Sequence, residues 1–349
     1  MKLPFTDRRI LLTGAGGSIG SALAKALLEQ QPESLILLDH SEGNLHQINF
    51  ELGAARNSDA VSPILGDIGD ATLLAEILEE QKPHIIIHAA AYKHVPLMEH
   101  NPLGAIRNNA IGTYRLAQMA RQYNVETLLM VSTDKAVNPR SIMGASKRLA
   151  ELALLRWSSP RTAMRAIRLG NVLGSQGSVV PLFQQQIAAG GPVTLTHPEV
   201  ARYFTTMDEA IELVLLAANL PEGCGIFTPY PGAPVRIQDL ADRMMRESDT
   251  VPHREIPTTI TGLRPGEKMN EEFVSELEQV EPSSCQKLRQ IKTPQIPSEQ
   301  FDSLFAALQE KVASRDLAVA LSILRQLIPE YRASDVVLAA AKQEQSSPL

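Results

Sequence analysis

The sequence predicts a doubly wound α/β fold, in which a parallel sheet lies between two layers of helices, with a smaller C-terminal lobe. Three observations support this. Short apolar segments alternate with segments of helical periodicity through the first half of the chain. A glycine-rich turn joins the first apolar segment to the first helical one. Beyond residue 175, glycine and proline interrupt the pattern, which indicates a separate lobe.

Six short apolar segments are expected to form the strands: residues 9–13, 35–38, 64–65, 85–88, 128–131 and 166–169. Apolar residues at helical spacing predict helices at residues 21–31, 72–80, 105–123, 143–155, 301–312 and 317–327. Asn108 and Asn109 are poor helix formers within the third of these helices. They are either a tolerated irregularity or a place where a side chain or loosened backbone faces a site.

These elements divide the chain into three expected regions. Residues 1–174 form a Rossmann-like dinucleotide-binding domain. Residues 175–335 form mainly a substrate lobe with closing helices, interleaved with the first domain. Residues 336–349 form a polar tail.

Composition narrows the class of protein. The 349 residues are 44% hydrophobic and 21% charged, as in soluble globular proteins. A formal charge of −6 and a pI near 5.8 argue against binding to nucleic acid or an anionic membrane. Cys224 and Cys285 lack metal-ligand spacing and fit a reducing compartment. The first strand leaves no room for a signal peptide, and the apolar runs are too short to cross a bilayer. We therefore expect a cytoplasmic protein with no metal and no membrane insertion.

The turn over residues 14–20 predicts a dinucleotide-binding site. Gly14 allows a tight turn, Gly17 lets the backbone approach a pyrophosphate, and Gly20 lets the helix pack on the strand. The N-terminus of the following helix offers N–H groups to the anion. A purely structural turn is the alternative, but a strand before it and a helix after it favour cofactor binding.

Asp39, at the end of the second strand, predicts a preference for NAD over NADP. A carboxylate there binds both ribose hydroxyls and repels a 2′-phosphate, and residues 40–42 contain no arginine. An ordinary strand-end role is the alternative. Asp67 and the backbone of Ile68 are placed for an adenine contact, and small residues at 89–91 let a flat cofactor lie on the backbone.

Thr133, Asp134 and Lys135 follow the fifth strand at the carboxyl edge of the sheet, where ligands bind in such folds. Asp134 and Lys135 are a candidate acid–base pair, although a solvated turn pair is the alternative. Met143 and Lys147 lie at i and i+4 of the next helix. A thioether neither donates nor accepts a proton usefully, so the helix offers a cation without a neighbouring acid or base.

Five motifs together resemble the UDP-N-acetylglucosamine 4,6-dehydratases, in the polysaccharide and capsule biosynthesis branch of the extended short-chain dehydrogenase/reductases. They are TGAGGSIGS (13–21), DHSE (39–42), HAAAYKHVP (88–96), STDKAVNP (132–139) and LRPGEK (263–268). The resemblance runs from about residue 5 to residue 331. Small soluble members of that family have tyrosine at position 143, and large members with an N-terminal membrane region have methionine. This chain has methionine without that region, so we expect either a free-standing catalytic domain or a fragment.

The resemblance implies a UDP-N-acetylhexosamine substrate, bound NAD and a homo-oligomer. The implied reaction oxidises C4 of the sugar, eliminates water across C5 and C6, and reduces C6. Lys135, in its neutral form, removes the C5 proton, and protonated Asp134 assists departure of the C6 hydroxyl. Desolvation and Lys147 are expected to keep Lys135 neutral, and burial to keep Asp134 protonated. Without a tyrosine, Thr133 is expected to relay the C4 hydroxyl proton to water or to Lys147.

Two sets of binding residues follow from the motifs and the resemblance. The expected cofactor residues are Gly14, Gly16, Gly17, Ser18, Ile19, Gly20, Asp39, Ser41, Asp67, Ile68, Ala89, Ala90, Ala91, Lys93, Asn109 and Lys147. The expected substrate residues are Lys93, Asn171, Val179, Arg202, Arg264 and Glu267.

Two other functions remain open. A UDP-hexosamine C4 epimerase needs the same cofactor and substrate sites, but it has little use for Asp134 and Lys135 and wants a tyrosine at 143. A non-catalytic NAD-binding scaffold is favoured by the missing tyrosine and disfavoured by the retained Lys147.

Overall fold

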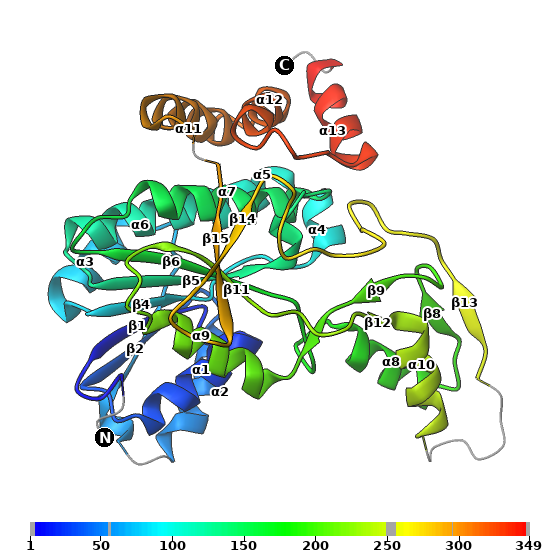
Figure 1. The fold of residues 1–349 in the computed structure, drawn as a ribbon, viewed down its shortest axis with the longest axis horizontal. Coiled ribbons are helices and arrows are strands. Elements are labelled where there is room, and N and C mark those ends of the chain that lie inside the picture. The colour runs from blue at the N-terminus through cyan, green and yellow to red at the C-terminus, as the bar shows by residue number, and fades with distance from the viewer. Residues whose placement is uncertain (1–3, 55–56, 249–255, 295, 347–349) are drawn as a thin grey trace.

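The computed structural model describes residues 4–54, 57–248, 256–294 and 296–346. Its centre is a nine-stranded sheet made of β1 (Arg9–Thr13), β2 (Ser34–Asp39), β3 (Val61–Leu65), β4 (Ile85–His88), β5 (Thr127–Thr133), β6 (Ala163–Leu169), β11 (Gly225–Pro229), β14 (Gln279–Pro282) and β15 (Leu288–Lys292). The strand order is β14-β15-β11-β6-β5-β4-β1-β2-β3. Neighbours from β3 to β11 are parallel, and β15 pairs antiparallel with β11 and β14. The predicted doubly wound fold is confirmed (Figure 1).

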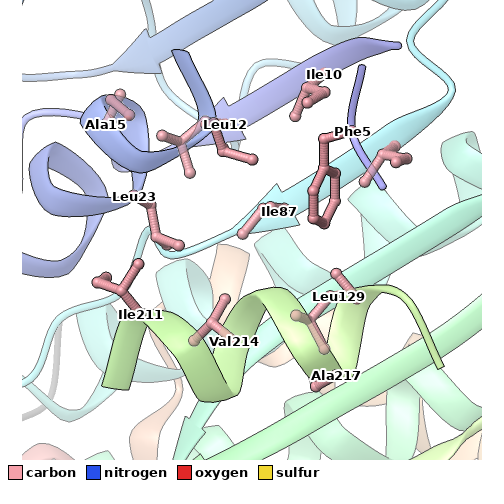
Figure 2. Packing of buried hydrophobic residues seen from close by; sticks show 14 of the residues in the cluster. Phe5, Ile10, Leu12, Ala15, Leu23, Ile87, Leu129, Ile211, Val214 and Ala217 are labelled. Atoms are coloured by element: carbon pink, nitrogen blue, oxygen red, sulfur yellow. The ribbon is translucent and has the colours of Figure 1, made fainter. Parts of the chain in front are cut away.

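The sheet is covered on both faces because its strands are apolar on both faces. Ile10 and Leu12 of β1 belong to a cluster with α1 (Ser18–Glu29), α2 (Glu42–Gly53) and α9 (Met207–Ala218). In Figure 2, Ile211, Val214 and Ala217 of α9 point toward Ile87 and Leu129 of the sheet. Leu11, one residue along β1, belongs to the opposite cluster, with α3 (Ala71–Gln81), α6 (Gly112–Gln122) and α7 (Ile142–Arg156).

Short capping side chains fix where several of these helices begin. The Ser41 hydroxyl accepts a hydrogen bond from the N–H of Asn44 at the start of α2. Thr206 and Glu209 form a reciprocal capping box at the start of α9. The predicted helix over residues 105–123 contains a π-helical segment, η2 (Ile106–Ile111), before α6. Its irregularity coincides with the two asparagines.

A smaller lobe extends from the sheet (Figure 1). It contains α8 (Val179–Ala188), α10 (Ile237–Arg246) and the strand pairs β8 (Val193–Leu195) with β13 (Thr258–Ile260) and β9 (Ala201–Arg202) with β12 (Val235–Arg236). Phe183, Val193 and Ile237 lie in its own apolar cluster. A further pair, β7 (Asn171–Val172) with β10 (Phe204–Thr205), joins segments on either side of α8. Between and after these lobe segments the chain returns to the main domain. There α9 packs on the sheet, and β11, β14 and β15 are strands of it.

Three C-terminal helices, α11 (Ser298–Ala313), α12 (Leu317–Leu327) and α13 (Asp335–Ser346), form a layer outside α7 and the short helices α4 (Val95–Glu99) and α5 (Pro102–Ala105). The rings of Tyr114 and Phe305 stack with centroids 4.0 Å apart. Residues 336–346, predicted as part of a polar tail, instead belong to helix α13, in which Val337 and Ala341 are buried against the neighbouring helices. Residues 347–349 lie outside the described residues.

Among the described residues, no helix is long and apolar enough to span a membrane.

Candidate active site

A cavity of about 720 Å³ lies at the carboxyl edge of the sheet and continues to the smaller lobe. Strand order reverses between β1 and β4, and ligands bind at such a point in doubly wound folds. Most of the predicted site residues line this cavity: Gly14, Gly17, Ser18, Ile19, Gly20, Asp39, Asp67, Ile68, Ala89, Ala90, Ala91, Lys93, Thr133, Lys135, Met143, Lys147, Asn171, Val179, Arg202, Arg264 and Glu267. Gly16, Ser41, Asn109 and Asp134 do not.

The glycine turn has the backbone geometry of a phosphate cradle. Gly14 has a φ of +67°, and a Cβ there would lie 2.6 Å from the backbone nitrogen of Ala90. A Cβ on Gly20 would lie 1.9 Å from the carbonyl oxygen of Gly14, whereas one on Gly17 would meet that oxygen only at 3.3 Å. The turn therefore packs tightly at Gly14 and Gly20. Gly17 is left open toward the cavity, where a pyrophosphate fits.

The cradle gives a direct test. Gly20→Ala is expected to abolish dinucleotide binding, because the new methyl group must displace the carbonyl of Gly14. Gly43→Ala is the matched control, since a Cβ at this position of α2 meets nothing within 4 Å. Equilibrium dialysis with NAD measures the loss, and circular dichroism checks that both variants fold. Equal affinity in the Gly20→Ala and Gly43→Ala proteins would exclude this turn as the binding site.

Gly16 and Ser41 reach the cofactor region indirectly, through Asp39. The Gly16 N–H donates to Oδ2 of Asp39 at 2.8 Å, and the Ser41 N–H donates to Oδ1 at 2.9 Å. These bonds fix a buried carboxylate at the cavity wall. Each carboxylate oxygen retains a lone pair for a ribose hydroxyl.

Asn109 also lies behind the cavity wall. Its side chain accepts from the Tyr92 N–H at 2.8 Å and donates to the Tyr92 carbonyl and the Ser146 hydroxyl, each at 3.0 Å. The π-helical segment therefore positions the loop after β4, which lines the cavity. Asn109 is therefore more than a tolerated irregularity, although its side chain acts through Tyr92 and it is Asn108 that lines the cavity.

Thr133, Asp134 and Lys135 form a hydrogen-bonded group where β5 passes into the 3₁₀ turn η3 (Asp134–Ala136). The Thr133 hydroxyl and Lys135 Nζ each donate to Oδ1 of Asp134 at 2.9 Å. Nζ also donates to Oδ1 of Asn171 at 3.0 Å. Asp134 is fully buried, and within the described chain its Oδ2 has no hydrogen-bond partner. The expected partner of Thr133, Lys147, instead donates to the Val131 carbonyl at 2.7 Å.

The expectation that desolvation and Lys147 lower the pKa of Lys135 overall is wrong. Burial lowers the pKa of Lys135, but the neighbouring carboxylates of Asp134 and Glu271 outweigh burial and raise it above its ordinary value. For Lys147 burial prevails, and its pKa falls to about 8. Lys147 lies one helical turn beyond the nearly buried Met143, and both line the cavity.

The far wall of the cavity comes from the LRPGEK segment and β9. Oε1 of Glu267 accepts from Nη2 of Arg202 at 3.1 Å, while the Arg264 N–H donates to Oε2 of Glu267 at 3.1 Å. Gly266, with a φ of +74°, makes the turn between them. Arg264 lines the lobe end of the cavity, whereas the guanidinium of Arg202 already donates to Glu267 and to the carbonyls of Ala201, Met269 and Lys268.

Lys268 and Glu271 also line the cavity and were absent from the predicted set. Lys268 is the last residue of the LRPGEK motif, but a single lysine in an irregular segment gives no sign of its partners. Glu271 lies beyond the motif, and only the fold brings it within 3.7 Å of Lys135.

Comparison with known proteins places these features in context. Residues 10–293 match the family described as polysaccharide biosynthesis protein. Capsular polysaccharide biosynthesis protein CapD of Staphylococcus aureus is 46% identical over 276 residues, which cover 78% of this chain and 46% of CapD. The chain thus spans about half the length of that relative.

Two relatives of more similar length have different activities in their names. UDP-N-acetylglucosamine 4,6-dehydratase (inverting) of Campylobacter jejuni is 31% identical, covering 78% of each protein. UDP-glucose 4-epimerase of Rickettsia rickettsii is also 31% identical, covering 78% of this chain and 79% of the epimerase.

Solved structures share the fold. Pen from Bacillus thuringiensis is 26% identical with a TM-score of 0.78, covering 87% of this chain and 99% of Pen. DesIV from Streptomyces venezuelae, a dTDP-glucose 4,6-dehydratase with NAD bound, is 22% identical with a TM-score of 0.65, covering 75% of this chain and 87% of DesIV.

Proposed function

Because this chain belongs to the polysaccharide biosynthesis protein family, we propose that it dehydrates a UDP-N-acetylhexosamine to the 4-keto-6-deoxy sugar nucleotide. The observation that carries the proposal is the Asp134–Lys135 pair, which is joined by a hydrogen bond of 2.9 Å beside the cavity. The same cavity is lined by Met143, at the position where a tyrosine phenol would take the hydroxyl proton in an enzyme that only oxidises the sugar. An elimination needs both an acid and a base, and this pair supplies one of each.

The residues of the cavity fit NAD. The open face of Gly17, the fixed carboxylate of Asp39 and the amine of Lys147 would hold its pyrophosphate and its two riboses. When bound, NAD supplies hydride acceptance from C4 of the sugar and hydride return to C6, so the cofactor is regenerated in each turnover.

Thr133 provides a route for the C4 hydroxyl proton. Thr133 lines the cavity, and its hydroxyl donates to Oδ1 of Asp134. As Thr133 accepts the proton of the sugar O4, it passes its own hydroxyl proton to Asp134, which becomes protonated. That acid then delivers the proton to the departing C6 hydroxyl, so one group serves two steps.

Lys135 acts between these steps. Protonation of Asp134 removes the nearest negative charge from the ammonium, so Lys135 releases a proton to the solvent in the cavity and becomes the neutral amine, and it regains that proton at the end of the cycle. The amine takes the C5 proton as water is lost from C5 and C6, and the resulting ammonium returns a proton to C5 when C6 is reduced. Asn171, at the start of β7, accepts a hydrogen bond from the same Nζ and holds the amine in place.

Incubation of the protein with UDP-N-acetylglucosamine and catalytic NAD in deuterated water tests the proposal. We expect a product lighter by one water, carrying solvent deuterium at C5. Mass spectrometry separates this result from its rivals. An isomer of unchanged mass would support the C4 epimerase, which the epimerase relative favours, and unchanged substrate would support a non-catalytic NAD-binding protein. A dehydrated product without deuterium at C5 would refute the role of Lys135.

A further inference from the structure

A second ion pair lies next to Lys135 in the cavity wall. Oε1 of Glu271 is 3.7 Å from Lys135 Nζ, and Oε2 of Glu271 is 3.4 Å from Lys268 Nζ. The Glu271 side chain is 4% exposed and that of Lys268 is 12% exposed. In the described chain, Oε2 of Glu271 accepts no hydrogen bond. The negative charge of this buried carboxylate therefore acts mainly on the two neighbouring ammonium groups, through electrostatic attraction.

The charged groups around Lys135 come from several segments. Asp134 precedes it in the turn after β5, Lys268 is the last residue of the LRPGEK motif, and Glu271 lies three residues beyond Lys268. The guanidinium of Arg202, on β9, acts on Lys135 from the lobe and lowers its pKa. Asp134 and Glu271 thus favour the ammonium of Lys135, while Arg202, itself paired with Glu267, and Lys268 offset part of that effect.

We propose that Glu271 and Lys268 act as a pair of positioning residues that set the charge of Lys135 during elimination and hold its amine toward the cavity. The inference rests on the proposed function, in which Asp134 becomes protonated before Lys135 acts. From that moment Glu271 is the remaining carboxylate beside Lys135 among the described residues.

The two members of the pair have opposite effects. Unshielded, Glu271 favours the ammonium of Lys135 and opposes its action as a base. Lys268 lies on the other oxygen of Glu271 and offsets that charge, which allows the proton to leave. The Lys268 ammonium is itself fixed by the Val137 carbonyl at 2.6 Å, three residues beyond Asp134. The pair and the acid–base group are therefore anchored to one turn.

Opposite shifts of the Lys135 titration distinguish this role from a structural one. Glu271→Gln is expected to move the acid limb of kcat to lower pH by about one unit or more, because an opposite charge near the amine is removed. Lys268→Met is expected to move it to higher pH, because Glu271 is no longer neutralised. The Glu271→Gln/Lys268→Met double variant should return near the wild-type profile, and Lys268→Arg should keep it.

A direct titration measures the same shifts without turnover. Reductive methylation with ¹³C-formaldehyde labels the lysines, and loss of one resonance in Lys135→Gln assigns Lys135. We expect its ¹³C titration to shift down in Glu271→Gln and up in Lys268→Met. Shifts in the same direction, or none, would overturn the inference. If the titrations shift as expected but no variant or wild-type protein dehydrates the UDP-sugar, the proposed function fails while the electrostatic coupling holds.

Discussion

Replacing Lys135 by methionine is expected to lower kcat for dehydration by about 10²–10⁴-fold, the usual contribution of one proton-transfer group. Methionine preserves the length of the side chain but cannot take the C5 proton. The KM for the UDP-sugar should change little, because Lys135 lies in the turn after β5, whereas the proposed nucleotide end of the cavity is near Arg264. Asp134→Asn should cost a similar factor. The double variant should lose little more than either single one, because the pair acts as a unit.

Solvent-deuterium exchange at C5, followed by NMR, checks this result apart from overall turnover. Lys287→Met is the matched control, because Lys287 is an exposed lysine paired with Glu212, away from the cavity lining. Its turnover should equal that of the unaltered protein. Undiminished exchange in Lys135→Met would show that another group is the base.

The second large effect concerns stability. Arg168 of β6 is fully buried and donates to both oxygens of Glu151 on α7 and to both oxygens of Glu278. Arg168→Met should therefore leave two buried carboxylates without their main partner. We expect the free energy of unfolding to fall by about 3–5 kcal/mol, the typical cost of breaking a buried ion pair on one side. Urea denaturation at neutral pH measures it, with the exposed Lys292→Met as the control.

The same network gives a pH dependence. Despite burial, hydrogen bonds and charge from Arg168 and Arg148 lower the pKa of Glu278 to about 2, below its ordinary 4.5. Its contribution to stability is present above pH 4.5 and is lost as the pH falls toward 2. In Arg168→Met the loss on acidification should be smaller, since the Glu278 pKa no longer lies so far below its unfolded value. An identical acid dependence in both proteins would contradict this account.

Local pattern predicted much of the fold. The segment 9–13 forms β1 with the expected bounds, and 317–327 forms α12 likewise, because their apolar spacing matches one regular element. The glycine turn was assigned in detail, since its demands are set by a few adjacent backbone atoms.

What sequence could not supply depends on contacts between distant segments. Asp39 was expected to contact the cofactor directly. The backbone N–H groups of Gly16 and Ser41 also hold its carboxylate, and this contact becomes visible only when β1 and β2 are placed side by side. Glu271 carried no local signal, and Asp134 together with Glu271 reversed the expected direction of the Lys135 pKa. Charge states of buried groups are set by neighbours in space, which a motif does not name.

The pairing of Arg168 with Glu278 also bears on how the chain is made. The two residues are 110 positions apart, so a ribosome adding about 5–20 residues per second takes roughly 5–20 s between them. Throughout that interval the first six strands of the sheet have been synthesised, while β6 at first lacks its neighbour β11, and Arg168 has Glu151 but not yet Glu278. The nascent protein therefore passes through a period in which the edge of β6 is unpaired and Arg168 has only one of its two carboxylate partners. An open strand edge favours chaperone binding or aggregation, and the speed of synthesis sets how long that period lasts.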